Sequence, residues 1–174
     1  MKESDEREFR EFAATRMDHL RGLAYLTCGD WHAAEDAVST ALASLYLHWT
    51  GIRNRDAYAR TTVVRASIDE KRRPWRRERP ATDTLPDRPV ADLTADHAER
   101  AYLLTALDRI PRGQRAVVVL RFYEELSVEE VARVLGRSTG TIKSQSARGL
   151  MALRAVLAAD GVAERERDGV SGRW

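Results

Sequence analysis

Residues 126–154 read LSVEEVARVLGRSTGTIKSQSARGLMALR, and this stretch decides the fold class of its half of the chain. Ser127 and Glu130 form an S-x-x-E capping box that opens a helix, and Gly136 is placed to end it. Ser138 then caps a second helix whose first turns are short and polar. Two helices joined by such a turn predict a helix-turn-helix, which places the start of its second helix in the DNA major groove.

Polar side chains at the start of this second helix suit contacts with base edges and phosphates. Arg and Lys bind guanine or phosphate, and Gln pairs with adenine. The expected DNA-binding residues here are Ser138, Thr139, Thr141, Lys143, Ser144, Gln145 and Arg148. Ile142 is expected to anchor the helix on its partner. An ordinary helical hairpin with a solvated face is the alternative, and the two caps favour DNA binding.

The residues before this motif also follow helical spacing. One helix is expected from near His97 to Pro111, and another over residues 114–123. Val117 to Leu120 have strand propensity, but no turn residues flank them, so we expect a buried helix there. These helices and the helix-turn-helix form a predicted domain over residues 97–158, followed by a tail, residues 159–174, that is expected to be disordered.

Three further helices are expected at the N-terminus. Gly29 ends the first, and Asp30 caps the second, whose apolar stripe reaches Trp49. The third begins near Asp56. Its inward-facing residues are expected to be Ala57, Thr61, Val64 and Ile68.

Proline marks the boundary between the two groups of helices. Four of the five prolines lie between Pro74 and Pro89, and few large apolar residues accompany them after Pro80. Such a segment buries too little surface to offset its ordering entropy, so residues 80–96 are predicted to be a flexible linker. The predicted fold is therefore all-α, with two small helical domains, residues 6–79 and 97–158, on either side of this linker.

The net charge of +2 conceals two basic segments. Residues 52–79 carry ten Lys and Arg against four Asp and Glu, and residues 126–157 carry five against two. Local excesses of this kind attract nucleic acid. Trp75 lies within the densest run, residues 71–79, where an aromatic ring can stack on unpaired bases. A solubilising extension of the third helix is the alternative role for this run.

Several classes of protein are excluded by what the sequence lacks. No apolar run approaches the roughly 18 residues of a membrane span, and the acidic N-terminus does not suit a signal peptide, so a cytoplasmic protein is expected. The lone Cys28 fits a reducing compartment. No phosphate-binding glycine motif is present, and Cys28 with His32 lacks further ligands, so no enzyme activity, cofactor or metal is expected.

Four segments in order resemble bacterial RNA polymerase sigma factors of the extracytoplasmic-function type, particularly the actinobacterial SigE group. These segments are AYLTCGDWHAAEDAV (24–38), AYARTTVVRASIDEKRR (57–73), IPRGQRAVVVLRFYEELS (110–127) and GTIKSQ (140–145). With their connections they cover about four-fifths of the chain. This resemblance implies a sigma region 2 domain, a linker that threads towards the RNA exit path, and a region 4 domain.

The resemblance also implies roles and partners. Region 2 would dock on the β′ clamp helices of core RNA polymerase through Glu35, Asp36 and Ser39. It would open the promoter −10 element and hold an extruded base through Arg53, Asn54, Arg55, Arg60, Arg65, Arg72 and Arg73. Region 4 would bind the β flap and read the −35 element. An anti-sigma factor is a further candidate partner.

Two positions depart from the family pattern. Ser39-Thr40 stand where many members carry Gln-Glu, and Arg65 stands where many carry Asn, so the −10 preference does not transfer. Two other functions compete with this reading: a dimeric helix-turn-helix regulator with palindromic operators, and a helical adaptor that binds polymerase without promoter selectivity.

Overall fold

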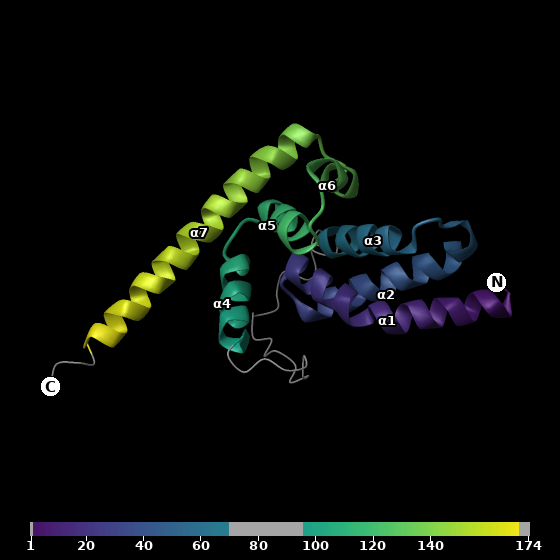
Figure 1. Cartoon of the computed structure of the whole chain (residues 1–174), viewed down its shortest axis with the longest axis horizontal. Coiled ribbons are helices and arrows are strands. Elements are labelled where there is room, and N and C mark those ends of the chain that lie inside the picture. Colours follow the sequence, from purple (N-terminus) through teal and green to yellow (C-terminus); the bar gives the residue numbers. More distant parts are fainter. Residues whose placement is uncertain (1, 70–95, 171–174) are drawn as a thin grey trace.

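The computed structural model describes residues 2–69 and 96–170, and all regular elements in these ranges are helical (Figure 1). The N-terminal domain consists of α1 (Glu3–Cys28), α2 (Trp31–His48), the 3-10 turn η1 (Trp49–Gly51) and α3 (Arg55–Asp69). The C-terminal domain consists of α4 (Asp96–Asp108), α5 (Arg112–Val118), the π-turn η4 (Val119–Tyr123), α6 (Val128–Leu135) and α7 (Thr139–Val170). The expected all-α class is confirmed.

The connection between α1 and α2 forms as the sequence predicts. Gly29 adopts the left-handed conformation, with φ of 72°, and its amide donates to the carbonyl of Tyr25. Asp30 accepts a hydrogen bond of 2.7 Å from the amide of Ala33. The two helices pack with α3 around Trp49, whose side chain is buried and meets Phe9 edge to face.

Helix α3 buries a face that only partly matches the one expected: Val64 is buried as expected, Ala57 and Thr61 are half-buried, and Ile68 is exposed. Its buried residues are Ala59, Val63, Val64 and Ser67, whereas Ile68 is 39% exposed. The prediction for Ile68 is therefore wrong. The reason is that α3 packs against α1 and α2 on one side and α6 on another, so tertiary contacts select a stripe that apolarity alone does not reveal.

In the C-terminal domain, the run from Val117 to Leu120 is buried and helical, as expected. The backbone widens into a π-turn from Val119, where the amide of Glu124 bonds the Val119 carbonyl. This widening was not predicted. The capping box forms in full, with the Glu130 amide 3.2 Å from Ser127 Oγ and the Ser127 amide 2.8 Å from Glu130 Oε2.

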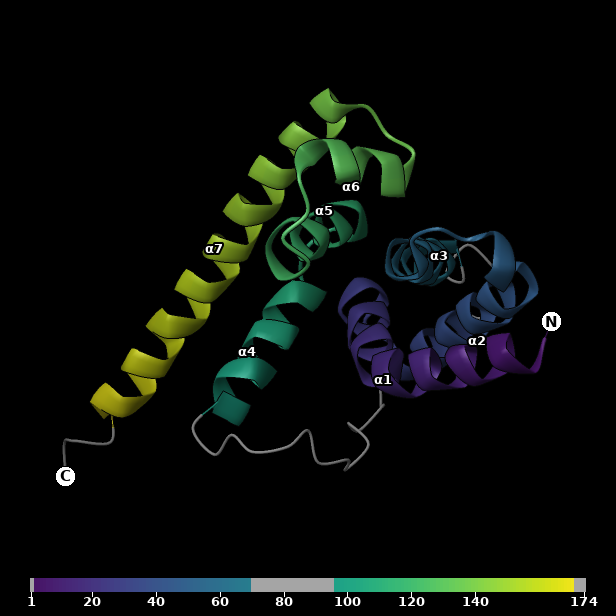
Figure 2. The same cartoon turned by 45° about the vertical axis from the view of Figure 1, so that its right-hand side comes forward.

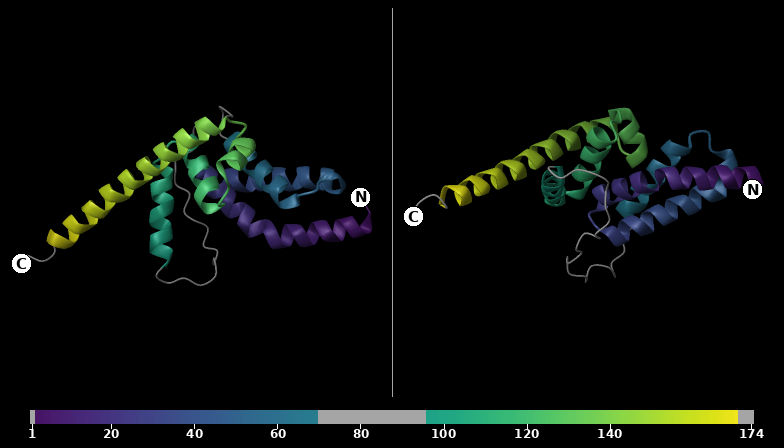
Figure 3. Two further views of the ribbon diagram at one scale, coloured as in Figure 1. Left: turned by 45° about the horizontal axis from the view of Figure 1, so that its top comes forward. Right: turned by 60° about the horizontal axis from the view of Figure 1, so that its bottom comes forward.

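Helix α7 continues well beyond the body of the domain (Figure 3). It runs to Val170. The tail that was expected to be disordered from residue 159 is therefore helical from residue 159 to Val170. Helix α4 begins at Asp96, one residue before the expected domain start. The greater part of the predicted linker, residues 80–95, and the basic run 71–79 lie outside the described residues.

The two domains pack directly against each other (Figure 2). Leu23 of α1 and Val64 of α3 are fully buried in one apolar cluster with Val117 and Leu120 of the other domain. Burying a Leu or Val side chain contributes about 1.5–3 kcal/mol. The interdomain contact therefore contains an apolar core to which both domains contribute.

Candidate nucleic-acid interface

The N-terminal end of α7 presents a polar surface on a firmly anchored helix. Ser138 Oγ accepts a hydrogen bond of 3.2 Å from the amide of Thr141, so the predicted cap is present. Ile142 is completely buried against the preceding helices. Lys143 and Arg148 are exposed. The helix thus holds cationic side chains outward from a fixed position, as direct readout in the major groove requires.

The remaining predicted residues of this helix differ in exposure. Ser138, Thr139 and Ser144 are exposed, whereas Thr141 and Gln145 are half-buried. The carboxamide of Gln145 lies over Gly113 at the start of α5, where an added Cβ would be 3.5 Å from its Nε2. Gln145 therefore bridges towards α5 in this structure, and the sequence did not indicate that position.

Gly149 is a structural determinant that the sequence analysis missed. A Cβ added there would lie 2.7 Å from Cγ2 of Val118 and 3.2 Å from the carbonyl oxygen of Gln114. The absence of a side chain therefore lets α7 approach α5 closely. A glycine inside an otherwise helical pattern was the available signal.

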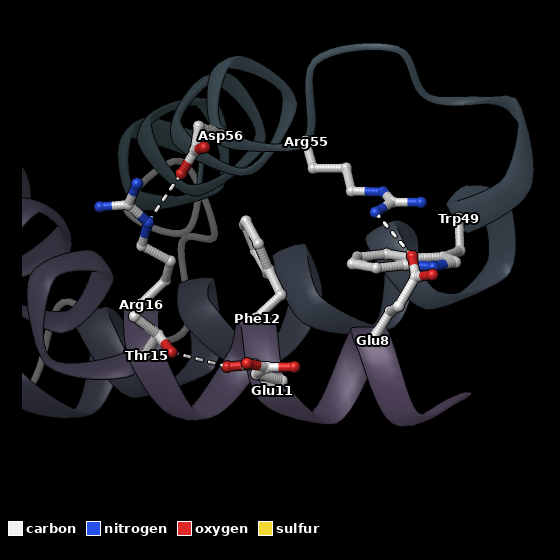
Figure 4. A pocket seen from close by; sticks show the side chains of 8 residues that line it. All are labelled: Glu8, Glu11, Phe12, Thr15, Arg16, Trp49, Arg55 and Asp56. Atoms are coloured by element: carbon white, nitrogen blue, oxygen red, sulfur yellow. Dashed lines mark hydrogen bonds and ion pairs between the residues drawn. The ribbon is translucent and has the colours of Figure 1, made fainter. Parts of the chain in front are cut away.

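The loop before α3 and the start of that helix lie beside an open cavity of about 310 Å³ (Figure 4). Asn54 caps α3, since its Oδ1 accepts a hydrogen bond of 2.9 Å from the Ala57 amide. The Cζ atom of Arg55 lies 3.9 Å from the centroid of the buried Trp49 ring, and Arg55 Nη1 lies 3.0 Å from Glu8 Oε2. The cavity is lined by Glu8, Glu11, Phe12, Thr15, Arg16, Trp49, Arg55 and Asp56.

The cavity combines charges of both signs with a buried aromatic ring. Arg16 Nε lies 2.7 Å from Asp56 Oδ1, which holds α1 against the start of α3. The indole Nε1 of Trp49 is buried and has no hydrogen-bond partner among the residues that the structure describes. A buried donor without a partner is costly. Arg53 is exposed and does not line this cavity.

Two of the arginines expected at the −10 site face the C-terminal domain instead. Arg60 Nη1 lies 3.3 Å from Glu124 Oε2, and His19 approaches the other oxygen of that carboxylate at 2.8 Å. Arg65 donates to the Val134 carbonyl at 2.8 Å. These two arginines therefore do not share a surface with Arg55. The further expected residues Arg72 and Arg73 lie outside the described residues.

The face of α2 expected to bind polymerase is accessible. Asp36 and Ser39 are exposed, while Glu35 is half-buried and pairs with Arg21 of α1 at 2.9 Å. This ion pair fixes Glu35 at the edge of the face. Thr40, at the departure from the family pattern, donates its hydroxyl to the Asp36 carbonyl at 2.8 Å.

The electrostatics of α6 reinforce the helix-turn-helix. The backbone and side-chain hydrogen bonds with Ser127 hold the pKa of Glu130 below its ordinary value of 4.5. The ionised carboxylate therefore stabilises the start of α6, where the helix dipole also favours negative charge. Among the described residues, no three His, Cys, Asp or Glu side chains form a metal-binding group, and no helix could cross a membrane.

Two family models match this chain. Residues 12–77 match Sigma-70 region 2, and residues 106–155 match Sigma-70, region 4. The chain is 40% identical over 155 residues to the RNA polymerase sigma-E factor of Streptomyces coelicolor, and the aligned region covers 87% of each chain. It is 41% identical over 150 residues to that of Streptomyces avermitilis, covering 84% of this chain and 83% of the relative.

A solved structure has the same fold. It is the sigma factor RpoE of Bartonella quintana in complex with the anti-sigma factor NepR. The TM-score is 0.70 at 20% identity, and the match covers 88% of this chain and 99% of that one. The arrangement of helices in both domains is thus shared with a protein of distant sequence.

Proposed function

The chain belongs to the sigma-70 family and is a sigma factor that directs promoter-specific initiation of transcription, and we propose how its residues divide this task. The C-terminal domain reads the −35 element, and the N-terminal domain binds polymerase and opens the −10 element. Each domain alone binds promoter DNA weakly. Joined in one chain on one polymerase, they gain affinity because the second contact becomes intramolecular.

The −35 element is read by the start of α7. The observation that carries this assignment is the exposed pair Lys143 and Arg148 on a helix anchored by the fully buried Ile142. Arginine and lysine donate to guanine edges or to phosphates, and the polar hydroxyls around them suit backbone contacts. Ser138, Thr139 and Ser144 supply these hydroxyls, Thr141 adds a half-buried one, and Gln145 lies at the edge towards α5.

The −10 element is opened by the loop before α3 and by the arginines along that helix. Extruding a base costs a few kcal/mol, which a pocket and positive charge along the freed strand can offset. The cavity beside Arg55 supports this role, because it brings an aromatic ring, that of Trp49, together with a guanidinium group that presents a flat cationic surface. Arg53 and Asn54 lie on the exposed loop that precedes α3.

Core polymerase is bound by the face of α2 that carries Asp36 and Ser39, with Glu35 at its edge. These residues contact the β′ clamp helices, and the C-terminal domain contacts the β flap. An anti-sigma factor is a candidate regulator, because the Bartonella relative of the same fold is bound to one. The protein acts in the cytoplasm, where polymerase and promoters are, and carries no catalytic residue of its own.

The test replaces Lys143 and Arg148 together by alanine. Genomic fragments transcribed by the reconstituted holoenzyme supply the promoters, and initiation is measured with core polymerase in vitro. We expect the double variant to lose −35-dependent initiation while its binding to core polymerase is unchanged.

The matched control is Arg7→Ala with Arg10→Ala on α1, which removes two cations whose side chains are 80% and 78% exposed. This control should initiate like the parent. Unchanged promoter choice in the Lys143→Ala, Arg148→Ala variant would refute the recognition-helix assignment. Symmetric protection of palindromic sites by the factor alone would favour a dimeric regulator instead.

A further inference from the structure

One face of α1 forms most of the wall of the cavity beside Arg55 and Trp49 (Figure 4). The residues that α1 contributes are Glu8, Glu11, Phe12, Thr15 and Arg16. Positions three and four apart are neighbours on the surface of a helix, so these side chains share one face. Glu8 and Glu11 precede residues 12–77, the segment that matches Sigma-70 region 2. The family resemblance therefore assigns no role to these two carboxylates.

Glu8 and Trp49 together fix the position of Arg55. Arg55 Nη1 lies 3.0 Å from Glu8 Oε2, and Arg55 Cζ lies 3.9 Å from the centroid of the Trp49 ring. The Trp49 ring packs edge to face against Phe9 and Phe12, with ring centroids 5.3 Å and 5.7 Å away. The Arg55 side chain is nevertheless 36% exposed. Because unpaired bases stack on guanidinium planes as well as on aromatic rings, Arg55 offers a fixed stacking surface.

The Glu11 carboxylate is the surplus charge of this cavity. Glu8 pairs with Arg55, and Asp56 Oδ1 lies 2.7 Å from Arg16 Nε. Neither arginine forms an ion pair with Glu11, which is exposed. Three acidic and two basic side chains line the cavity, so their charges sum to −1. That balance repels a phosphate group but suits a neutral group with N–H donors, since hydrogen bonds to an ionised acceptor are the stronger ones.

We propose that the extruded base of the −10 element enters this cavity and stacks on Arg55, and that Glu11 selects a base with an exocyclic amino group. The inference rests on the proposed assignment of the loop before α3 to the −10 element. Adenine, cytosine and guanine each carry an amino group that can donate to a carboxylate, whereas thymine carries none. Glu11 is thus a specificity-determining residue, and Glu8 is a positioning residue that acts on the base through Arg55.

Premelted templates test the selection with the reconstituted holoenzyme. The −10 element of a promoter that the holoenzyme transcribes is placed in a bubble, and each nontemplate position is changed in turn to each of the four bases. We expect one position at which thymine lowers the affinity of the parent by about 5-fold or more relative to the preferred amino-bearing base. Glu11→Gln should remove most of this penalty, because a carboxamide can also donate to thymine O4.

The positioning role of Glu8 has a different signature at the same template position. Glu8→Gln should weaken the binding of all four bases there by a similar factor, and the loss should vanish on a template that is abasic at that position. Arg55→Ala should have the same effect. Combining the two substitutions should cost no more than Arg55→Ala alone, a non-additivity that independent residues do not show.

Glu3→Gln is the matched control for both substitutions. Glu3 lies on the same helix, its side chain is 93% exposed, and it does not line the cavity, so affinity should be unchanged on every template. Circular dichroism checks that each variant is folded.

The outcomes separate this inference from the proposed function. An unchanged thymine penalty in Glu11→Gln, or a parent that accepts thymine at every −10 position, would overturn the selection by Glu11. Additive losses from Glu8→Gln and Arg55→Ala would overturn the positioning role. Either result leaves the proposed function standing while the parent initiates from the promoter. A parent that fails to direct initiation removes the proposed function, and this inference with it.

Discussion

Gly149→Ala tests whether close packing of α7 on α5 sets the stability of the helix-turn-helix domain. Alanine favours a helix interior over glycine by about 1 kcal/mol, so propensity alone predicts stabilisation. The packing predicts the opposite, because the new Cβ would lie 2.7 Å from Val118 Cγ2 and 3.2 Å from both Cβ and the carbonyl oxygen of Gln114. Carbon atoms prefer about 3.5–4.0 Å, and overpacking costs about 1–3 kcal/mol.

The cost belongs in the upper part of that range. Two of the three atoms belong to the backbone or Cβ of Gln114 and cannot rotate away, and Val118 is β-branched and stiff. We expect a net loss of about 1–2 kcal/mol, which is a factor of about 5–30 in the ratio of folded to unfolded protein. Urea unfolding of the full-length chain, followed by circular dichroism, measures it.

Gly140→Ala is the matched control in the same helix. Among the described residues, an added Cβ there approaches only Ser138 Oγ, at 4.0 Å, so alanine should leave the stability unchanged or raise it by up to about 1 kcal/mol. If Gly149→Ala is as stable as the parent or more so, the close approach of α7 to α5 does not constrain this domain, and the packing argument fails.

Three shorter predictions concern other elements. Ser127→Ala should lower the free energy of unfolding by about 1 kcal/mol in urea, because it removes the cap of α6. The lowered pKa of Glu130 means that its ionised form stabilises α6 above the ordinary value of 4.5, and that this contribution is lost as the pH falls through the folded value. Glu130→Gln should therefore lose stability less steeply than the parent on acidification, and parallel curves would contradict this. Asp36→Lys should weaken binding to core polymerase measured by anisotropy, whereas Asp18→Lys, which reverses a 96% exposed charge on α1, should not.

Local features of the fold were predictable from the sequence because their causes are local. Asp30, Ser127 and Ser138 all cap helices where expected, and Gly29 and Gly136 both adopt the left-handed conformation. Each of these depends on bonds within a few residues along the chain. The same holds for the exposure of Lys143 and Arg148 and the burial of Ile142, since an amphipathic helix after a capped turn has one inward and one outward face.

Features that depend on distant residues were not predictable. The exposure of Ile68 and the position of Gln145 follow from packing between helices far apart in sequence. The family resemblance placed Arg60 and Arg65 among the expected DNA-binding arginines, but it cannot show that carbonyls and a carboxylate of the other domain bind them in this structure. Likewise, no residue type in the sequence indicates the π-helical turn that begins at Val119.

The contact of Arg65 with main-chain carbonyls has a consequence for how such a protein evolves. Every residue at positions 133 and 134 supplies a carbonyl oxygen, so no particular side chain is required opposite Arg65. A lineage could therefore acquire or lose the hydrogen bonds of Arg65 by a single substitution at position 65, without a compensating substitution in the other domain. Searches for pairs of positions that change together across relatives would overlook it.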